Sequence, residues 1–415
     1  MKIGILAHGF MNWTGGIDFL RSVVLSLKAF QPEVQIIFLV PSKGPRVQLY
    51  NTIISVLNWI TPLIHKGAAQ RAIVSDVEVI NMISKISKIS EVIKIDIGTR
   101  ALLNVCNKHE IDILLPSIKP LPKDLAVPWI GYLADFQHKY YPEYFSRIER
   151  QRRDKWFLKM LDQASSVLVN SNQTRSDASE LAQDAKNKLV CLPFNAAPEK
   201  EWLSSVGSQK MNAHILKGPF FIICNQFWKH KGYEVALQAF SQFSKSHPNV
   251  RLIITGKTLD TRDPTYFGRI EELINNLGLT SRVDILGLVP KLDQIHLLRS
   301  SIALIQPTFF EGGPGGGSVY DAVSVGCSCI ISDIAVNREL ASESLVTYFK
   351  VGDANDLANV MRDQVDFHKN NFKQPAQLEE TGHIRRQACG RVLFVTVENQ
   401  LSKNLEVSAA LHLHD

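Results

Sequence analysis

The chain of 415 residues is too long for one ordinary hydrophobic core, so its length predicts two domains. Its composition, 45% hydrophobic and 21% charged, is that of a globular protein and excludes a disordered or fibrous one. The net charge of +6 is compatible with phosphate-bearing ligands or an anionic membrane surface. The basic residues show no aromatic interleaving and no zinc-finger spacing, so nucleic-acid binding is not expected.

The cysteines and the N-terminus indicate a reducing compartment. Six cysteines are scattered through apolar contexts without a histidine cluster, which favours buried free thiols over a metal site. The run MKIGILAHGF is too short for a signal peptide, and no window has the length of uncharged apolar sequence that a spanning helix needs. We therefore expect a cytoplasmic protein, with peripheral attachment to the inner face of the plasma membrane left open.

Short apolar runs alternate with helical patterns in two series. The first series covers 2–7, 35–40, 111–115, 129–133 and 166–170, and the second covers 220–224, 251–255, 283–286, 303–306 and 329–332. Near-continuous apolar strands between helices indicate parallel sheets covered on both faces, so we expect two doubly wound α/β domains. Periodicity is lost over 196–218. The predicted domains are 1–200 and 201–382, followed by a helix over 383–415 that could cross back to the first domain.

The first strand is followed by the turn NWTGGI at 12–17, before a helix predicted over 18–30. Gly15 and Gly16 would bring the helix N-terminus close to phosphates. Downstream, 47–64 has a wide apolar face bracketed by basic residues; it is either an interfacial helix on an anionic bilayer or an ordinary core helix. The stretch 80–94 repeats Ile every third residue and fits a solvated helix.

Polar segments follow two further strands. The segment 134–146 (ADFQHKYYPEYFS) places Asp135 and His138 at a strand end, where they would meet a substrate or would merely cap and pack a helix. The segment 225–232 (NQFWKHKG) places Lys229 and Lys231 after another strand, where a solvated surface turn is the alternative.

The most informative segment is 307–322 (PTFFEGGPGGGSVYDA), between a buried strand and a helix. Its five glycines and two prolines cannot fill a core. They allow close backbone approach and positive φ angles, and they direct free N–H groups at a ligand, for which a diphosphate is expected. Ser318 and Asp321 also form an S-x-x-D capping box.

This segment resembles the signature of the retaining glycosyltransferase family 4 (glycosyl transferases group 1), which has the two-domain GT-B fold. In that signature a Glu and an acidic residue eight positions later flank a Gly-rich turn. The resemblance implies that Glu311 contacts the donor sugar. Position 319 is Val, and the next acid is Asp321, which implies a two-residue insertion. Asp321 would then either hold the nucleotide ribose or only cap the helix.

The other segments follow the same family. NQFWKHKG resembles its G-R-L-x-x-x-K-G turn, in which an Arg and a Lys neutralise the leaving diphosphate. Lys231 takes the Lys position, Gln226 stands where Arg is usual, and Lys229 is a candidate for the missing cation. ADFQHKYYPEYFS resembles the D-x-Q-H…P-E-F-F-S segment of a subset involved mostly in bacterial surface-polysaccharide synthesis.

The resemblance implies a retaining transfer of a sugar from a nucleotide-sugar donor to a glycan or lipid-linked acceptor in an interdomain cleft, in polysaccharide or lipopolysaccharide synthesis. No D-x-D motif ends a strand, so we expect no metal and no cofactor. The alternatives are a GT-B nucleotide-sugar epimerase or hydrolase and a non-catalytic sugar-nucleotide-binding scaffold. The residues expected in catalysis are His138, Asp135, Lys231 and Glu311. Those expected to bind the nucleotide sugar are Gly15, Gly16, Gln226, Lys229, Lys231, Gly287, Leu288, Val289, Glu311, Gly312, Gly313, Gly315, Gly316, Gly317, Ser318 and Asp321.

Overall fold

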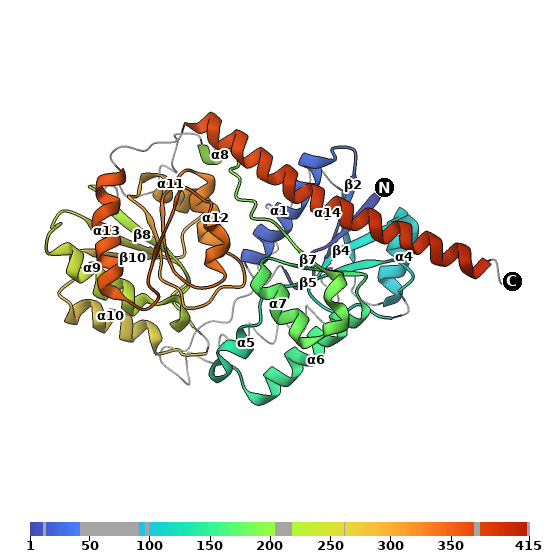
Figure 1. Cartoon of the computed structure of the whole chain (residues 1–415), viewed down its shortest axis with the longest axis horizontal. Helices are drawn as coiled ribbons and strands as arrows, with labels where there is room; N and C mark the ends of the chain where they lie inside the picture. The colour runs from blue at the N-terminus through green and yellow to red at the C-terminus, as the bar shows by residue number, and fades with distance from the viewer. Residues whose placement is uncertain are drawn as a thin grey trace. The chain divides into compact units, whose positions relative to one another are not determined.

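The computed structural model describes residues 1–10, 14–41, 91–95, 99–123, 125–203, 218–260, 262–368 and 374–412 (Figure 1). The chain divides into two compact units. Unit 1 comprises Met1–Asn170, Thr174–Pro193 and Arg386–Asp415, and unit 2 comprises Ser171–Gln173 and Phe194–Arg385. The last helix therefore contributes residues to both units.

Unit 1 contains a seven-stranded parallel sheet with the order β3-β2-β1-β4-β5-β6-β7. Its strands are β1 (Lys2–Leu6), β2 (Gln35–Pro41), β3 (Glu91–Ile95), β4 (Ile113–Ser117), β5 (Trp129–Leu133), β6 (Ser166–Val169) and β7 (Leu189–Cys191). Its helices are α1 (Thr14–Phe30), α4 (Thr99–His109), α5 (Gln137–Tyr140), α6 (Arg147–Gln163) and α7 (Asn172–Leu181), the last beginning in unit 2. The strand order reverses between β1 and β4, which defines the switch point of a doubly wound sheet.

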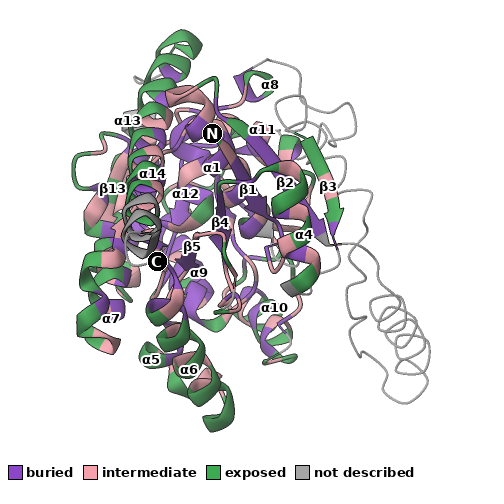
Figure 2. Ribbon diagram, turned by 90° about the vertical axis from the view of Figure 1, so that its right-hand side faces the viewer, coloured by how far each residue is buried: buried purple, intermediate pink, exposed green. Residues whose placement is uncertain are grey.

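Successive strand residues of unit 1 face opposite sides of the sheet. Ile36 and Phe38 of β2 belong to the hydrophobic cluster that includes Leu20 of α1. Ile37 and Leu39 of the same strand belong to the cluster that includes helices on the other face. Figure 2 shows β1 and β4 buried, whereas the outer surface of α6 is exposed. Both faces are covered, which explains why these strands are apolar almost throughout.

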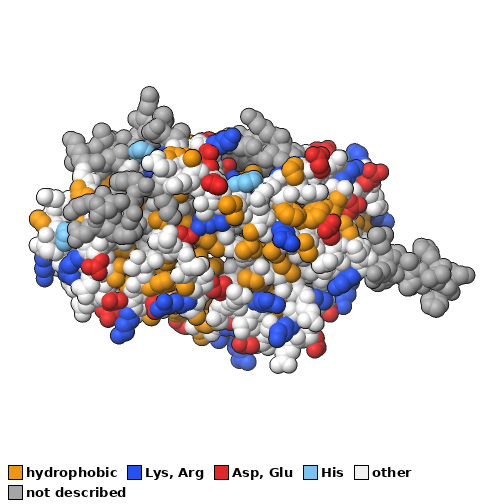
Figure 3. Space-filling model, turned by 45° about the horizontal axis from the view of Figure 1, so that its top comes forward, with side chains coloured by type: hydrophobic (Ala, Val, Ile, Leu, Met, Phe, Trp, Pro, Cys, Tyr) orange, Lys and Arg blue, Asp and Glu red, His pale blue; other side chains and the backbone are white. Residues whose placement is uncertain are grey.

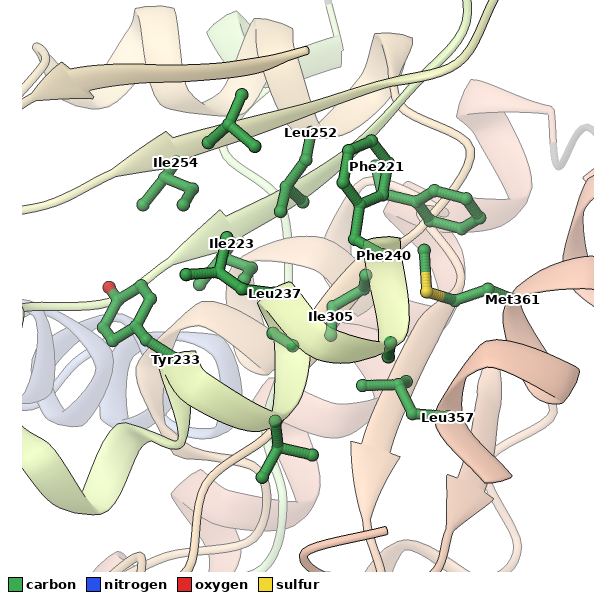
Figure 4. Close-up of a cluster of buried hydrophobic side chains, with 14 of the residues drawn as sticks. Phe221, Ile223, Tyr233, Leu237, Phe240, Leu252, Ile254, Ile305, Leu357 and Met361 are labelled. Atoms are coloured by element: carbon green, nitrogen blue, oxygen red, sulfur yellow. The ribbon is translucent and has the colours of Figure 1, made fainter. Parts of the chain in front are cut away.

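Unit 2 contains a six-stranded parallel sheet with the order β10-β9-β8-β11-β12-β13. Its strands are β8 (Phe220–Cys224), β9 (Arg251–Thr255), β10 (Val283–Gly287), β11 (Leu304–Gln306), β12 (Cys329–Ser332) and β13 (Val346–Phe349). Its helices are α8 (Lys200–Leu203), α9 (Tyr233–Ser244), α10 (Tyr266–Asn276), α11 (Lys291–Ser300), α12 (Gly316–Ser324) and α13 (Ala354–His368). The switch point lies between β8 and β11. Figure 4 shows one face of this core, where α9 packs Leu237 and Phe240 against β8 and β9.

The final helix, α14 (Pro375–His412), is a single helix (Figure 1). It begins at proline, whose missing N–H is not needed in a first helical turn. From Cys389 onward it buries Leu393 and Val397 in the α1 side of the unit 1 core. Gly390 allows this contact, because a Cβ there would lie 2.0 Å from the carbonyl oxygen of Ser26.

The prediction of two doubly wound α/β domains is confirmed, and the predicted strands are present with small shifts of their ends. The helix predicted over 80–94 is wrong at its C-terminal end, because Glu91–Ile95 forms the edge strand β3. An edge strand is exposed along one side, and its residues there do not have to be apolar. The rest of that stretch, and all of 47–64, lie outside the described residues.

The cysteines are free, and all but the half-buried Cys191 and Cys224 are buried. Among the helices that the structure describes, none combines the length and the apolar composition needed to cross a bilayer.

Candidate functional site

The switch point of unit 2 brings two loops together, one after β8 and one after β11. Lys231 lies in a short 3-10 turn, Lys229–Lys231, that ends at Gly232 in the left-handed conformation with φ of +68°. A Cβ at Gly232 would lie 2.0 Å from the carbonyl oxygen of Pro307. The backbone N–H of Phe309 also donates to the carbonyl of His230 at 2.8 Å. Glycine is therefore required at 232 for the two loops to meet.

Lys231 and Glu311 form an ion pair across these loops. Lys231 Nζ lies 2.5 Å from Glu311 Oε1, and the two side chains are only 11% and 10% exposed. Gln306 Nε2 also donates to Glu311 Oε1 at 2.9 Å, and Asn225 Nδ2 donates to Gln306 Oε1 at 2.6 Å. The structure thus brings together two of the residues predicted to act in catalysis, and it fixes the Glu311 carboxylate by two donors.

The Gly-rich loop leads into the N-terminus of α12. Gly315 is the N-cap residue and is left-handed, with φ of +69°. Its N–H donates to Asn337 Oδ1 at 2.8 Å. A Cβ on Gly316 would lie 2.8 Å from Glu311 Oε2, whereas one on Gly317 would meet nothing within 4 Å. The Glu311 carboxylate therefore packs on the first turn of α12, where the free N–H groups and the positive end of the helix dipole attract negative charge.

Asp321 does not cap this helix. Because α12 starts at Gly316, Ser318 and Asp321 both lie inside it, and the capping interpretation is wrong. The Ser318 hydroxyl donates instead to Gln306 Oε1 at 3.3 Å. Asp321 accepts from Lys291 Nζ at 2.7 and 2.6 Å through its two oxygens. Ribose binding by Asp321 stays a prediction, and Lys291 is a partner that the sequence did not predict.

The remaining part of the β8 loop carries further charge. Lys229 is exposed and Gln226 is half-buried. The Arg262 guanidinium lies 4.8 Å from the centre of the Trp228 ring and pairs with Asp260 at 3.2 Å. His230 is buried; loss of solvation, followed by the charges of Lys231 and Arg262, lowers its pKa to about 2. His230 is therefore neutral at pH 7, and the cations here are Lys229 and Lys231 of this loop and Arg262 of the segment after β9.

Gly287, Leu288 and Val289, which are expected to bind the nucleotide sugar, lie at the end of β10 and directly after it. Gly287 has φ of +65°, and its carbonyl accepts from the N–H of Gly256 at 2.8 Å. Leu288 is 74% exposed, which is unusual for leucine, and Val289 follows it in the same loop. Nucleotide-sugar binding by Gly287, Leu288 and Val289 stays a prediction.

In unit 1 the predicted glycine turn is part of a helix. Helix α1 begins at Thr14, so Gly15 and Gly16 lie in its first turn and the predicted start at residue 18 is wrong. Two glycines in a first turn still leave the helix N-terminus unobstructed by side chains. Residues 12 and 13 of the predicted turn lie outside the described residues.

His138 was predicted to face a substrate, but its side chain is buried. Its side chain is 1% exposed, and its Nε2 lies 2.9 Å from Asp154 Oδ1. The ring packs among Phe136, Phe145 and Phe157. Asp135 accepts from the N–H of Gln137 at 2.9 Å, at the start of α5. This arrangement corresponds to the packing and capping alternative, because burial of the ring separates it from any substrate in this conformation.

Within the described ranges, no group of three or more His, Cys, Asp or Glu side chains is arranged to hold a metal ion. The expectation of a metal-independent reaction stays a prediction.

Comparisons with known proteins agree with this architecture. Residues 208–382 match the family model described as Glycosyl transferases group 1. The search of curated proteins finds no match. Among solved structures, sucrose-phosphate synthase from Thermosynechococcus elongatus is 15% identical, with a TM-score of 0.59 over 100% of both chains. HepE from Anabaena in complex with UDP and glucose is 16% identical, with a TM-score of 0.56 over 98% of this chain and 100% of that one.

A further similar structure is WaaG, a glycosyltransferase involved in lipopolysaccharide biosynthesis. It is 12% identical, with a TM-score of 0.53 over 97% of this chain and 98% of that one. At these low identities the likenesses show the fold, and they confirm the predicted GT-B architecture of two Rossmann-like domains.

Proposed function

We propose that this glycosyltransferase, whose residues 208–382 match the glycosyl transferases group 1 domain on a GT-B fold, moves a sugar from a nucleotide-sugar donor to a glycan or lipid-linked acceptor. The observation that carries the proposal is the Lys231–Glu311 pair at the N-terminus of α12. At this switch point Lys231 and the N–H groups of the first turn of α12 provide positive charge for the diphosphate. The Glu311 carboxylate provides hydrogen-bond acceptors for the sugar.

Each group has a distinct part in the transfer. Negative charge develops on the diphosphate as the bond to the sugar breaks, and Lys231 together with the α12 amides stabilises that charge. Glu311 accepts hydrogen bonds from hydroxyls of the donor sugar and fixes its orientation. Before the donor binds, the ion pair with Glu311 already holds Lys231 in position. Little reorganisation of this charge is therefore needed during the reaction.

Because Gln226 stands where the family pattern has Arg, the leaving diphosphate has fewer cations around it than that pattern provides. Lys229 on the loop of Lys231 and Arg262 above Trp228 are candidates to supply the charge. The proposed reaction needs no divalent metal and retains the configuration at the anomeric carbon, both on the strength of the family resemblance. The proposed role is in bacterial surface-polysaccharide synthesis.

The decisive experiment is a transfer assay with a panel of nucleotide sugars and candidate acceptors, with and without EDTA. We expect transfer that survives EDTA, and a loss of about 100-fold or more on Glu311→Ala or Lys231→Ala. If both variants transfer the sugar as fast as the wild type does, the assignment is refuted. Conversion of the donor without any acceptor would favour the epimerase or hydrolase alternative, and NMR of the product tests retention.

Helix α6 supports an anionic membrane surface as a partner. It carries six basic and three acidic residues, and Arg152, Lys155 and Lys159 lie on one exposed face. Ile148, at 76% exposed, lies beside these cations on the same side of the helix. By contrast, the face in Figure 3 shows acidic and basic side chains intermixed. Exposed cations beside an exposed apolar side chain suit the headgroup region of an anionic bilayer.

Flotation with vesicles tests this part of the proposal. We expect recruitment to vesicles containing phosphatidylglycerol at low salt, and loss of recruitment on Lys155→Glu with Lys159→Glu. Charge reversal at exposed Lys186 and Lys200 is the matched control and should preserve binding. Recruitment that is equal in both double variants would exclude α6 as the docking surface.

A further inference from the structure

A lysine and a histidine side chain, Lys119 and His8, meet at the switch point of unit 1. His8 follows β1 and Lys119 follows β4, the two neighbouring strands between which the strand order reverses. Lys119 Nζ lies 3.2 Å from His8 Nε2. The loops are in close contact, since a Cβ on Gly9 would lie 2.4 Å from Ile118. Ligands of doubly wound sheets bind at this position, beyond the carboxyl ends of the strands.

Among the described residues, no carboxylate balances the charge at this point. Burial and the charge of Lys119 both lower the pKa of His8, so the ring is neutral at pH 7 and accepts a hydrogen bond from Lys119. Lys231 and Lys291 in unit 2 each contact a carboxylate. Lys119 is half-buried, and within the described part of the chain it has no carboxylate partner. A partly desolvated ammonium with spare N–H donors favours a bound anion.

An exposed aromatic ring lies beside this cation. Lys119 Nζ is 5.7 Å from the centre of the Trp156 ring, and Trp156 is 43% exposed. A large exposed indole offers a flat apolar face on which the C–H face of a sugar ring can pack. The Ser117 hydroxyl donates to the carbonyl of Lys119 at 2.6 Å and holds the backbone of this loop.

We propose that Lys119, His8 and Trp156 form a binding site for a phosphorylated sugar acceptor, with the phosphate on Lys119 and His8 and the sugar ring on Trp156. Lysine is a point-charge donor well suited to phosphate, whose oxygens can accept from several N–H groups together. The inference rests on the proposed function, because that proposal assigns donor binding to unit 2. It adds that the acceptor bears a phosphate near the sugar that receives the transfer.

The test is calorimetric titration of the full chain with inorganic phosphate and with glucose 6-phosphate. The titrations are run in the presence of a saturating nucleoside diphosphate, chosen as the one that raises the melting temperature most. We expect Lys119→Met to weaken both ligands about tenfold or more, the effect of losing one charge-assisted hydrogen bond. Lys119→Arg should retain most of the affinity. Trp156→Ala should weaken glucose 6-phosphate but leave inorganic phosphate unchanged.

Lys123→Met is the matched control, because Lys123 lies on the same segment, is 74% exposed and pairs with Asp162. It should bind both ligands as the wild type does. Equal phosphate affinity in Lys119→Met and wild type would overturn the site. Weaker binding of the nucleoside diphosphate itself in Lys119→Met would overturn the acceptor assignment, since the anion would then belong to the donor. Lys119-dependent phosphate binding without any nucleoside diphosphate binding would support this site and refute the proposed donor site.

Discussion

At the scale of single residues, unit 2 holds each of its two candidate donor carboxylates with a lysine. Glu311 is paired with Lys231, and Asp321 is paired with Lys291. Both carboxylates are nearly buried, so each lysine has a structural role in addition to any role toward a ligand. Substitutions at these positions therefore change stability and activity together, and an experiment has to separate the two effects.

The Lys231–Glu311 pair allows that separation. Lys231→Met leaves the Glu311 carboxylate without its cation, and we expect the free energy of unfolding to fall by about 3 kcal/mol. Adding Glu311→Gln removes the uncompensated charge, so the double variant should recover most of this loss. Urea denaturation measures both changes.

Activity should follow a different pattern. The double variant restores neither the cation for the diphosphate nor the carboxylate for the sugar, so it should be as inactive as Lys231→Met. Recovery of transfer together with stability would show that the pair acts only as a structural contact.

His230 gives a prediction for pH dependence. Its pKa in the folded state, about 2, lies below the ordinary value of 6.5. The unfolded chain therefore takes up a proton first as the pH falls, and stability is lost below about pH 6.5, by up to ~1.4 kcal/mol per pH unit. Comparison of wild type with His230→Gln between pH 7 and 4 checks this. The variant should lose stability less steeply, and parallel curves would contradict the prediction.

At the scale of elements, the start of α12 determines where Glu311 lies. Gly316 has φ of +68° and the Glu311 carboxylate directly above it, whereas the next residue, Gly317, has open space. Gly316→Ala should displace Glu311 and weaken donor binding by about tenfold, with a loss of stability of ~1 kcal/mol or more. Gly317→Ala should leave stability unchanged or raise it, because alanine favours a helix. Calorimetry and thermal melting of the two variants measure the difference.

Equal effects of the two alanines on donor binding would mean that the position of Glu311 is not set by the first turn of α12.

The sequence predicted the elements of the sheets where both faces are buried. Strands such as β8 are apolar throughout and cannot be mistaken for surface elements. The strand β3 (EVIKI) was missed because an edge strand has exposed polar residues and resembles one side of an amphipathic helix.

The site was predictable to the level of its loops but not of its contacts. Glu311 and Lys231 were each identified, but their contact joins residues 80 positions apart, which no local pattern encodes. The capping box at Ser318 failed because the left-handed Gly315 starts the helix earlier. His138 matched a motif, but three phenylalanine rings decide its burial. Nothing in the sequence marked Lys291 as a partner of Asp321, apart from its position at the start of a helix.

At the scale of the whole molecule, the two units have separate cores, and α14 contributes to both. Leu393 is 1% exposed within the core of unit 1, far along the chain from the strands and the α1 residues of that core. Leu393→Ala should destabilise unit 1 by about 3 kcal/mol. A nucleoside diphosphate that binds unit 2 should still raise the melting of unit 2 by the same amount in the variant. Differential scanning calorimetry with and without the ligand measures both effects.

Loss of the ligand-induced shift in Leu393→Ala would show that the two units do not unfold independently.

The contribution of α14 to unit 1 also bears on how the protein is made. The sheet of unit 1 is complete once Leu189–Cys191 has been synthesised, but the helix that covers its α1 side follows roughly two hundred residues later. At about 5–20 residues per second, the ribosome reaches Leu393 some 10–40 s after β7. During that interval Val23, Val24 and Leu27 of the nascent chain lack part of their final cover. The N-terminal half is therefore synthesised first but is the last part to receive its full apolar cover.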